Sequence, residues 1–227
     1  MISGSTRLIG LLGHPVVDSF SPRMQNAAFA ARGLDWAYVP CDVALEAFEP
    51  AVRGLLAAGF AGANVTAPYK LAAAEIAETD LPSVNTLVFE GGRIRGFSTD
   101  AAVLAGLPAE RPAVLGDGGA AAAFREALPH ARTFARRGEW PPDVADADLV
   151  VNATSEREEV LAELGSGQTL VDLPYPETAT AKAARERGAR VVDGLEVLVA
   201  QGAASFELWT GMPAPFEAMR SAVGLSS

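Results

Sequence analysis

The sequence has few of the residues that form disulfides and metal centres. It contains one cysteine, Cys41, and two histidines, His14 and His130, among 227 residues. A single cysteine excludes an internal disulfide and a cysteine metal cluster. Two imidazoles without cysteine partners disfavour a zinc site, so we expect no bound metal. This cysteine usage suits a reducing compartment.

The sequence also lacks the segments that insert into membranes. No apolar run reaches the ~18 residues that a transmembrane helix needs. Residues 1–12 have neither the basic start nor the cleavage site of a signal peptide. We therefore expect a cytoplasmic protein with no membrane contact. Its length suits one large domain or two small ones.

Positive charge is scarce as well. The sequence has 18 lysines and arginines against 28 aspartates and glutamates, which gives a formal net charge of -10. This balance excludes a general affinity for nucleic acid, because a polyanion would be repelled. A local basic pocket for a small anion remains compatible with it.

Short apolar runs alternate with alanine-rich stretches along the whole chain. This alternation is typical of an α/β protein with mainly parallel strands. The dipeptide Gly91-Gly92 predicts a hairpin between two neighbouring strands. The predicted strands are 8–12, 37–39, 62–65, 86–89, 113–115, 133–135, 149–151, 169–171 and 190–192. The predicted helices begin near positions 21, 45, 68, 99, 119, 177 and 195.

Two helix starts have clear sequence signals. Ser21 before Pro22 predicts an N-cap followed by the first helical residue, and Gly33 predicts the end of that helix. Asp193 with Glu196 resembles a capping box in which aspartate is the cap.

A glycine-rich stretch follows the strand predicted at 113–115. Gly116 and Gly118, with Ala121 three residues later, stand between a strand and a helix. That is the context of the dinucleotide-binding fingerprint, in which free N–H groups at the helix start hold a diphosphate. An ordinary strand-to-helix turn remains the alternative.

Arg136 and Arg137 follow the next predicted strand, where the residue that selects the nucleotide is expected. An acid there would hold the ribose hydroxyls of NAD, whereas two guanidinium groups suit a 2′-phosphate. We therefore predict NADP(H). The alternative is a basic pair on a solvated loop.

Lys70 stands in the first turn of a helix if Pro68 is the first helical residue. The helix dipole disfavours a positive charge there, and a lysine so placed can act as a general acid or base. Asn64 and Thr66 could bind polar groups of the same ligand. Asp100 stands at another predicted helix start. The alternative for Lys70 is a solvated surface lysine. The alternative for Asp100 is an aspartate that only makes a favourable contact with the helix dipole.

Taken together, these motifs show that the sequence resembles the shikimate dehydrogenase family. The resemblance runs from Gly13 to Gly211 through seven blocks in the same order. The blocks are "GHPVVDSFSPRMQNAAF", "GANVTAPYK", "SVNTL", "GFSTD", "LGDGGAAAA", "VVNATS" and "DGLEVLVAQGAASFELWTG".

The resemblance implies reduction of 3-dehydroshikimate to shikimate with NADPH, by hydride transfer to a ring ketone. It implies Lys70 and Asp100 as the catalytic pair. The substrate-binding residues it implies are Ser19, Ser21, Thr66, Asn85, Thr99, Tyr175 and Gln201. The cofactor-binding residues it implies are Gly116, Gly118, Gly119, Ala120, Arg136, Arg137, Asn152, Ala153, Thr154 and Gly194.

The resemblance also implies a two-domain α/β fold. Residues 1–98 with 203–227 would form a mixed α/β substrate-binding domain, on which the C-terminal helices pack. Residues 99–202 would form a Rossmann-like NADP-binding domain, with the active site in the cleft between the two. The expected oligomeric state is a monomer or a homodimer.

Three positions depart from the family pattern. Asp18 and Gln25 stand where the family usually has histidine, and Ser98 stands where it usually has asparagine. Three alternatives to the shikimate dehydrogenase activity stay open. They are a dehydrogenase of quinate or a related ring acid using NAD(P), a ligand-binding paralog without turnover, and a folate-linked dehydrogenase of similar architecture.

Overall fold

The computed structural model describes residues 2–225, and the chain divides into two compact units. The first contains the residues up to Thr99 and those from Val199 onward, and the second is Asp100–Leu198. The predicted boundaries, after positions 98 and 202, lie one and four residues from these divisions. Helix α6, Gly194–Thr210, contributes to both units.

The first unit contains a mixed five-stranded sheet in the order β2-β1-β3-β4-β5. β1 pairs in parallel with β2 and β3, whereas β4 pairs antiparallel with β3 and β5. The β4–β5 turn is the predicted hairpin, with Gly91 and Gly92 at φ values of 58° and 78°. The strands are β1 Arg7–Gly13, β2 Trp36–Asp42, β3 Gly62–Val65, β4 Thr86–Glu90 and β5 Arg93–Phe97.

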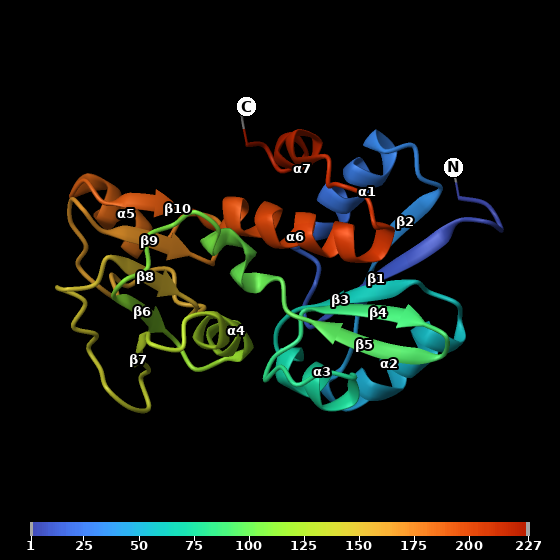
Figure 1. Ribbon diagram of the computed structural model, residues 1–227, viewed down its shortest axis with the longest axis horizontal. Helices are drawn as coiled ribbons and strands as arrows, with labels where there is room; N and C mark the ends of the chain where they lie inside the picture. The colour runs from blue at the N-terminus through green and yellow to red at the C-terminus, as the bar shows by residue number, and fades with distance from the viewer. Residues whose placement is uncertain (1, 226–227) are drawn as a thin grey trace. The chain divides into compact units, whose positions relative to one another are not determined.

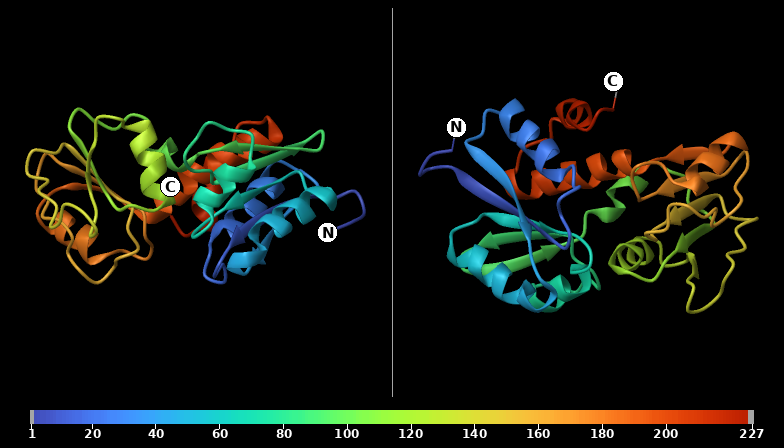
Figure 2. Two further views of the ribbon diagram at one scale, coloured as in Figure 1. Left: turned by 90° about the horizontal axis from the view of Figure 1, so that it is seen from below. Right: turned by 180° about the vertical axis from the view of Figure 1, so that it is seen from behind.

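Helices cover both faces of this sheet (Figures 1 and 2). On one face, α2 and α3 bury Phe48 and Tyr69, whose rings stack with centroids 4.5 Å apart. On the other face α1 meets α6, where Phe29 contacts Phe206 at 5.6 Å between ring centroids. The helices are α1 Ser21–Ala31, η1 Leu45–Ala47, α2 Phe48–Ala57, α3 Lys70–Ile76 and α7 Phe216–Ala222.

The end of α1 agrees with its sequence signal. Gly33 has a φ of 65°, its N–H donates to Ala30, and the N–H of Leu34 donates to Phe29. This is the Schellman motif that a glycine after the last helical turn predicts.

The second unit contains a parallel five-stranded sheet in the order β10-β9-β8-β6-β7. Its buried residues alternate between the two faces. Val114 and Val151 face α4, whereas Leu115 and Val150 belong to the cluster that includes α5. The strands are β6 Pro112–Leu115, β7 Arg132–Phe134, β8 Leu149–Asn152, β9 Thr169–Asp172 and β10 Arg190–Val192.

The helical cover of this second sheet is short. α4 spans Gly119–Ala127 and α5 spans Ala179–Glu186, while residues 135–148 contain no helix. That segment has Pro141 and Pro142, which remove backbone donors, and several aspartates that disfavour a helix interior. The observed architecture confirms the predicted fold class, a mixed α/β unit and a Rossmann-like parallel unit.

Three local predictions were wrong. Pro68 is not the first helical residue, because Thr66–Tyr69 form a hydrogen-bonded turn and α3 begins at Lys70. Ser21 is not an N-cap, because Phe20 holds that position. The helix predicted near position 99 is only a 3₁₀ segment, η2 Asp100–Leu104.

Within the described residues, no helix is long and apolar enough to cross a membrane.

Candidate active site

Asn85 is the centre of a buried polar cluster in the first unit. Its Nδ2 donates to Thr99 Oγ1 at 2.9 Å and to Gln201 Oε1 at 3.3 Å. Its Oδ1 accepts the N–H of Thr99 at 2.8 Å. Strand β4 begins beside Asn85, whereas Thr99 follows β5 and Gln201 lies on α6. The structure therefore brings together three of the predicted substrate-binding residues.

Asn64 supports this cluster from β3. Its Oδ1 accepts the Tyr38 hydroxyl at 2.8 Å, and its Nδ2 donates to the Asn85 carbonyl at 3.0 Å. The same Nδ2 lies 3.1 Å from the hydroxyl oxygens of Thr86 and Ser205. The sequence-based interpretation of Asn64 as a ligand-binding group needs correction, because protein groups occupy its amide.

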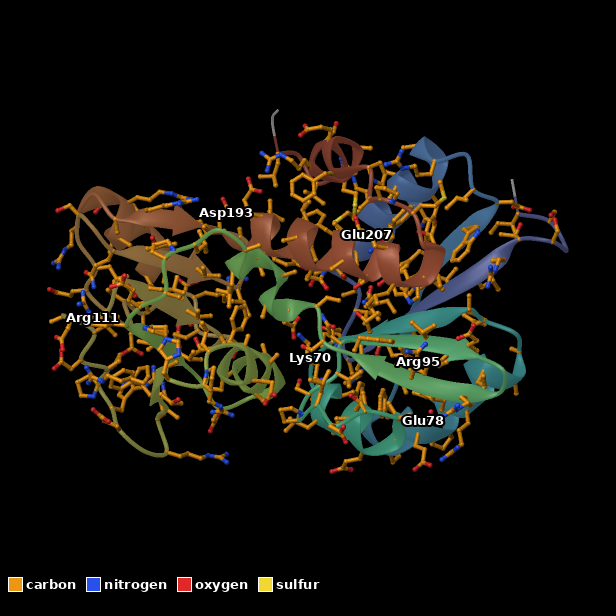
Figure 3. The ribbon with its side chains drawn as sticks, in the orientation of Figure 1. Lys70, Glu78, Arg95, Arg111, Asp193 and Glu207 are labelled. Atoms are coloured by element: carbon orange, nitrogen blue, oxygen red, sulfur yellow. The ribbon has the colours of Figure 1, made fainter. Side chains whose placement is uncertain are left out.

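Lys70 and Thr66 lie beside this cluster in the first unit. The Lys70 carbonyl accepts the N–H of Val84, directly before Asn85, at 2.9 Å. Thr66 follows Val65, whose N–H donates to the Asn85 carbonyl at 2.8 Å. Figure 3 shows Lys70 near the end of β5. The half-buried Lys70 is the first residue of α3, so it still stands in a first helical turn.

Ser19 and Ser21 lie at the start of α1. The Ser19 hydroxyl accepts the N–H of Ser21 at 3.2 Å, so Ser19 satisfies a backbone donor of the first residue of α1. One turn later the buried Gln25 donates to the carbonyl of Gly202 at 2.9 Å. Gly202 follows Gln201, so this bond ties α1 to the polar stretch of α6.

The glycine-rich turn of the second unit has the predicted strand–turn–helix context. Gly116 has a φ of 121°, and a Cβ added there would lie 3.0 Å from the Ala153 carbonyl oxygen. Gly118 is the N-cap of α4, and a Cβ added there would meet nothing within 4 Å. Gly119 and Ala120 are the first residues of α4. A turn of this kind before a helix start fits an anionic diphosphate, which helix N–H groups can bind.

Asn152 and Thr154 form the loop next to this turn, held by a buried carboxylate. Asn152 Oδ1 accepts the N–H of Thr154 at 3.1 Å, and its Nδ2 donates to Asp172 at 2.7 Å. The second oxygen of Asp172 accepts the Thr178 hydroxyl at 2.8 Å. Burial raises the pKa of the Asp172 carboxyl, although bonds from Asn152 and Thr178 oppose this effect.

The raised pKa of Asp172 predicts a pH effect on stability. The folded state binds this proton more tightly than the unfolded state, so the Asp172 contribution to stability falls as pH rises from about 3.8 through the folded-state pKa. Asp172→Asn should remove this slope. We expect the unfolding free energy of the variant, relative to wild type, to rise between pH 4 and 7 in urea titrations. Asp143→Asn, an exposed charge change, is the control. Parallel pH profiles for D172N and wild type would contradict the assignment.

Arg136 and Arg137 follow β7, but only one has a charged partner. Arg136 forms an ion pair with Glu159, and its guanidinium carbon lies 5.1 Å from the centroid of the Trp140 ring. Arg137 is exposed and forms no ion pair with any described residue. The two arginines are therefore not equivalent.

Tyr175 and Gly194 belong to adjacent segments of the second unit. A Cβ added to Gly194 would lie 2.3 Å from the Pro174 carbonyl oxygen, so only glycine lets α6 begin against this loop. Asp193 caps the helix, since its Oδ1 accepts the N–H groups of Leu195 at 3.1 Å and Glu196 at 3.2 Å. The aspartate cap confirms its sequence signal.

Lys70 belongs to the first unit, whereas Asp100 opens the second. Their pairing stays a prediction.

Several contributing residues were not predicted from the sequence. Asp172 had a recognisable signal, because it is an acid at the end of an apolar strand. Thr86, Ser205 and Glu159 had none, because each acquires its polar partner from a distant part of the chain.

Comparison with known proteins places the chain in a family. Residues 11–86 match the model of the shikimate dehydrogenase substrate binding domain, and residues 194–223 match the shikimate 5'-dehydrogenase C-terminal domain. A relative from Anaeromyxobacter dehalogenans, named shikimate dehydrogenase (NADP(+)), is 39% identical over 95% of both chains. The chain belongs to the shikimate dehydrogenase family. This confirms the resemblance drawn from the seven sequence blocks.

Solved structures of the shikimate dehydrogenase family have the same fold. Shikimate 5-dehydrogenase from Thermus thermophilus, in complex with NADP(H) and shikimate, is 29% identical with a TM-score of 0.82. That alignment covers 95% of this chain and 98% of the other. Quinate dehydrogenase from Corynebacterium glutamicum, in complex with NAD, is 25% identical with a TM-score of 0.80, covering 96% of this chain and 98% of the other.

Proposed function

We propose that this protein is an NADP-dependent shikimate dehydrogenase that reversibly reduces 3-dehydroshikimate to shikimate. The observation that carries this proposal is the Asn85 cluster, in which Thr99 and Gln201 converge on one amide beside Lys70. The name of the Anaeromyxobacter relative supports the same substrate and cofactor.

In this proposal the first unit binds the substrate. A ring with several hydroxyls needs donors and acceptors held at defined angles, and Asn85, Thr99 and Gln201 provide amide and hydroxyl groups within one hydrogen-bonded cluster. Ser19 and Ser21 would bind the substrate carboxylate at the start of α1. An anion is favoured there by the positive end of the helix dipole.

Lys70 would act as the general acid of the reduction. Its ammonium would donate a proton to the oxygen of the developing alkoxide and take it back in the reverse direction. Asp100 would orient the ammonium toward that oxygen.

The second unit would hold the nucleotide. The N–H groups at the start of α4 would bind the diphosphate, and Arg136 would bind the 2′-phosphate. The loop Asn152–Thr154 and the backbone at Gly194 would support the rest of the nucleotide. NADP(H), when bound, supplies or accepts the hydride.

An absorbance assay of nucleotide reduction tests the proposal. Shikimate and quinate are each supplied with NADP⁺ and with NAD⁺. We expect the highest kcat/KM for shikimate with NADP⁺. Ligand-induced thermal stabilisation without turnover would instead indicate a binding protein.

Arg136→Gln should reduce the preference for NADPH over NADH. A charge-assisted bond to a phosphate contributes about 1.5 kcal/mol or more, so we expect about a tenfold loss of NADPH affinity and little change for NADH. The measurement is fluorescence titration of each nucleotide, with Arg187→Gln as the matched control, because Arg187 is also exposed and paired with a glutamate. Equal losses for both nucleotides would refute a role for Arg136 at the 2′-phosphate.

A dehydrogenase of quinate with NAD is the second candidate. The observation that favours it is the Arg136–Glu159 pair, because a carboxylate already neutralises the arginine that would select NADP. The structural likeness to a quinate dehydrogenase in complex with NAD supports the same alternative. A higher kcat/KM for quinate with NAD⁺ in the assay would establish it.

A further inference from the structure

The ion pair between Arg136 and Glu159 joins the segments that follow the two strands on either side of β6. β6 carries this turn at its end and lies between β7 and β8 in the sheet. Arg136 follows β7, whereas Glu159 is in the segment that follows β8. All three strands are parallel, so their ends meet at the same edge of the sheet. The pair is therefore at the nucleotide edge.

A chain of hydrogen bonds fixes the segment that holds Glu159. Asn152 accepts the Thr154 hydroxyl at 2.7 Å, and the Thr154 oxygen accepts the N–H of Glu156 at 3.2 Å. The carboxylate of Glu156 then accepts the N–H groups of Arg157 and Glu158 at 2.9 Å each, and that of Glu159 at 3.3 Å. Asn152, the first residue of this chain of hydrogen bonds, donates in turn to the buried Asp172. The position of Glu159 is thus specified by the fold.

The guanidinium of Arg136 is held on two sides. Glu159 pairs with it, and the ring of Trp140 lies 5.1 Å from its central carbon. Glu159 contacts the guanidinium through Nη2, and a phosphate that binds two N–H groups of this planar fork needs that same nitrogen. The carboxylate and the phosphate therefore compete, and they also repel each other.

We infer that Glu159 is a specificity-determining residue that lowers the preference of this protein for NADP over NAD. The inference rests on the proposed function, in which Arg136 binds the 2′-phosphate. Glu159 competes with the 2′-phosphate of NADP for Arg136, whereas NAD leaves the Arg136–Glu159 pair undisturbed. Removing the Glu159 charge should then strengthen the binding of NADPH and leave that of NADH nearly unchanged.

The test is Glu159→Gln, measured as dissociation constants of NADPH and NADH by fluorescence titration of the full chain. Exposed ion pairs contribute at most about a fivefold change in an equilibrium, so we expect NADPH to bind about three- to fivefold tighter. The gain should shrink at high salt, because the competition is electrostatic. Glu158→Gln is the matched control, since Glu158 is exposed and its carboxylate has no ion pair among the described residues.

A double-mutant cycle assigns the gain to Arg136. In an Arg136→Gln background, Glu159→Gln should no longer favour NADPH. Equal gains for NADPH and NADH, an equal effect of E158Q, or weaker NADPH binding by E159Q would each overturn the inference. Binding of neither nucleotide by the wild-type protein would overturn the proposed function as well. If both proteins bound the nucleotides normally and the ratio of the NADPH and NADH dissociation constants were the same in E159Q as in wild type, only the inference would be overturned.

Discussion

Replacing Lys70 with methionine is expected to lower kcat by about 10² to 10⁴, which is the usual contribution of a positioned proton donor. Methionine keeps the length and apolar stem of lysine but has no proton to give. The KM for shikimate and the Kd of NADPH should change little, because Lys70 acts on the alkoxide that develops during reduction. Steady-state kinetics in both directions, with nucleotide titrations, measure the two effects separately.

The chain offers a close control for this variant. Lys182 is the only other lysine, and it is exposed on α5. Lys182→Met removes the same charge and should leave kcat unchanged. If K70M instead raised KM and kept kcat, Lys70 would be a binding residue, and the proposed acid–base role would be wrong.

Replacing Asn64 with leucine is expected to destabilise the first unit by about 3 kcal/mol. Leucine has the same branched shape but a larger volume, so some overpacking adds to the loss of the polar contacts. The Tyr38 hydroxyl would lose its acceptor at Asn64, and the hydroxyls of Thr86 and Ser205 would lose the amide. Urea unfolding followed by circular dichroism measures the loss. Activity should fall too, because Asn64 also supports Asn85.

A second substitution separates the Asn64 network from simple packing. Tyr38→Phe should destabilise the wild-type protein but cost much less in the Asn64→Leu background, because the hydroxyl has already lost that acceptor. Additive losses, or a cost of N64L below about 1 kcal/mol, would mean that the amide contributes little to the network.

The parts of the fold that depend on neighbouring residues were predictable. Gly91 and Gly92 specified a tight hairpin, Gly33 ended α1, and Asp193 capped α6. The prolines of segment 135–148 disfavoured a helix, and none is present there. Each of these features follows from the φ values, donors and acceptors of a few consecutive residues.

The sequence signals were wrong about where α1 and α3 begin. Ser21 and Pro22 suited an N-cap and first helical residue, yet the Ser19 hydroxyl accepts the N–H of Ser21. Pro68 likewise suited a helix start, yet it lies inside the turn Thr66–Tyr69, which is closed by the bond from the Tyr69 N–H to the Thr66 carbonyl. In both places the sequence was compatible with two registers, and packing of the whole unit selected one.

The sequence by itself determined the family, the α/β class and most residues proposed for the site, because these depend on motifs and on short-range patterns. Only the tertiary structure decided what those side chains contact. It directs the Asn64 amide toward Tyr38 and Ser205, gathers Thr99 and Gln201 around Asn85, and pairs Arg136 with Glu159. The physical reason is that folding brings polar groups from distant parts of the chain within hydrogen-bonding distance, and the buried ones require such a partner.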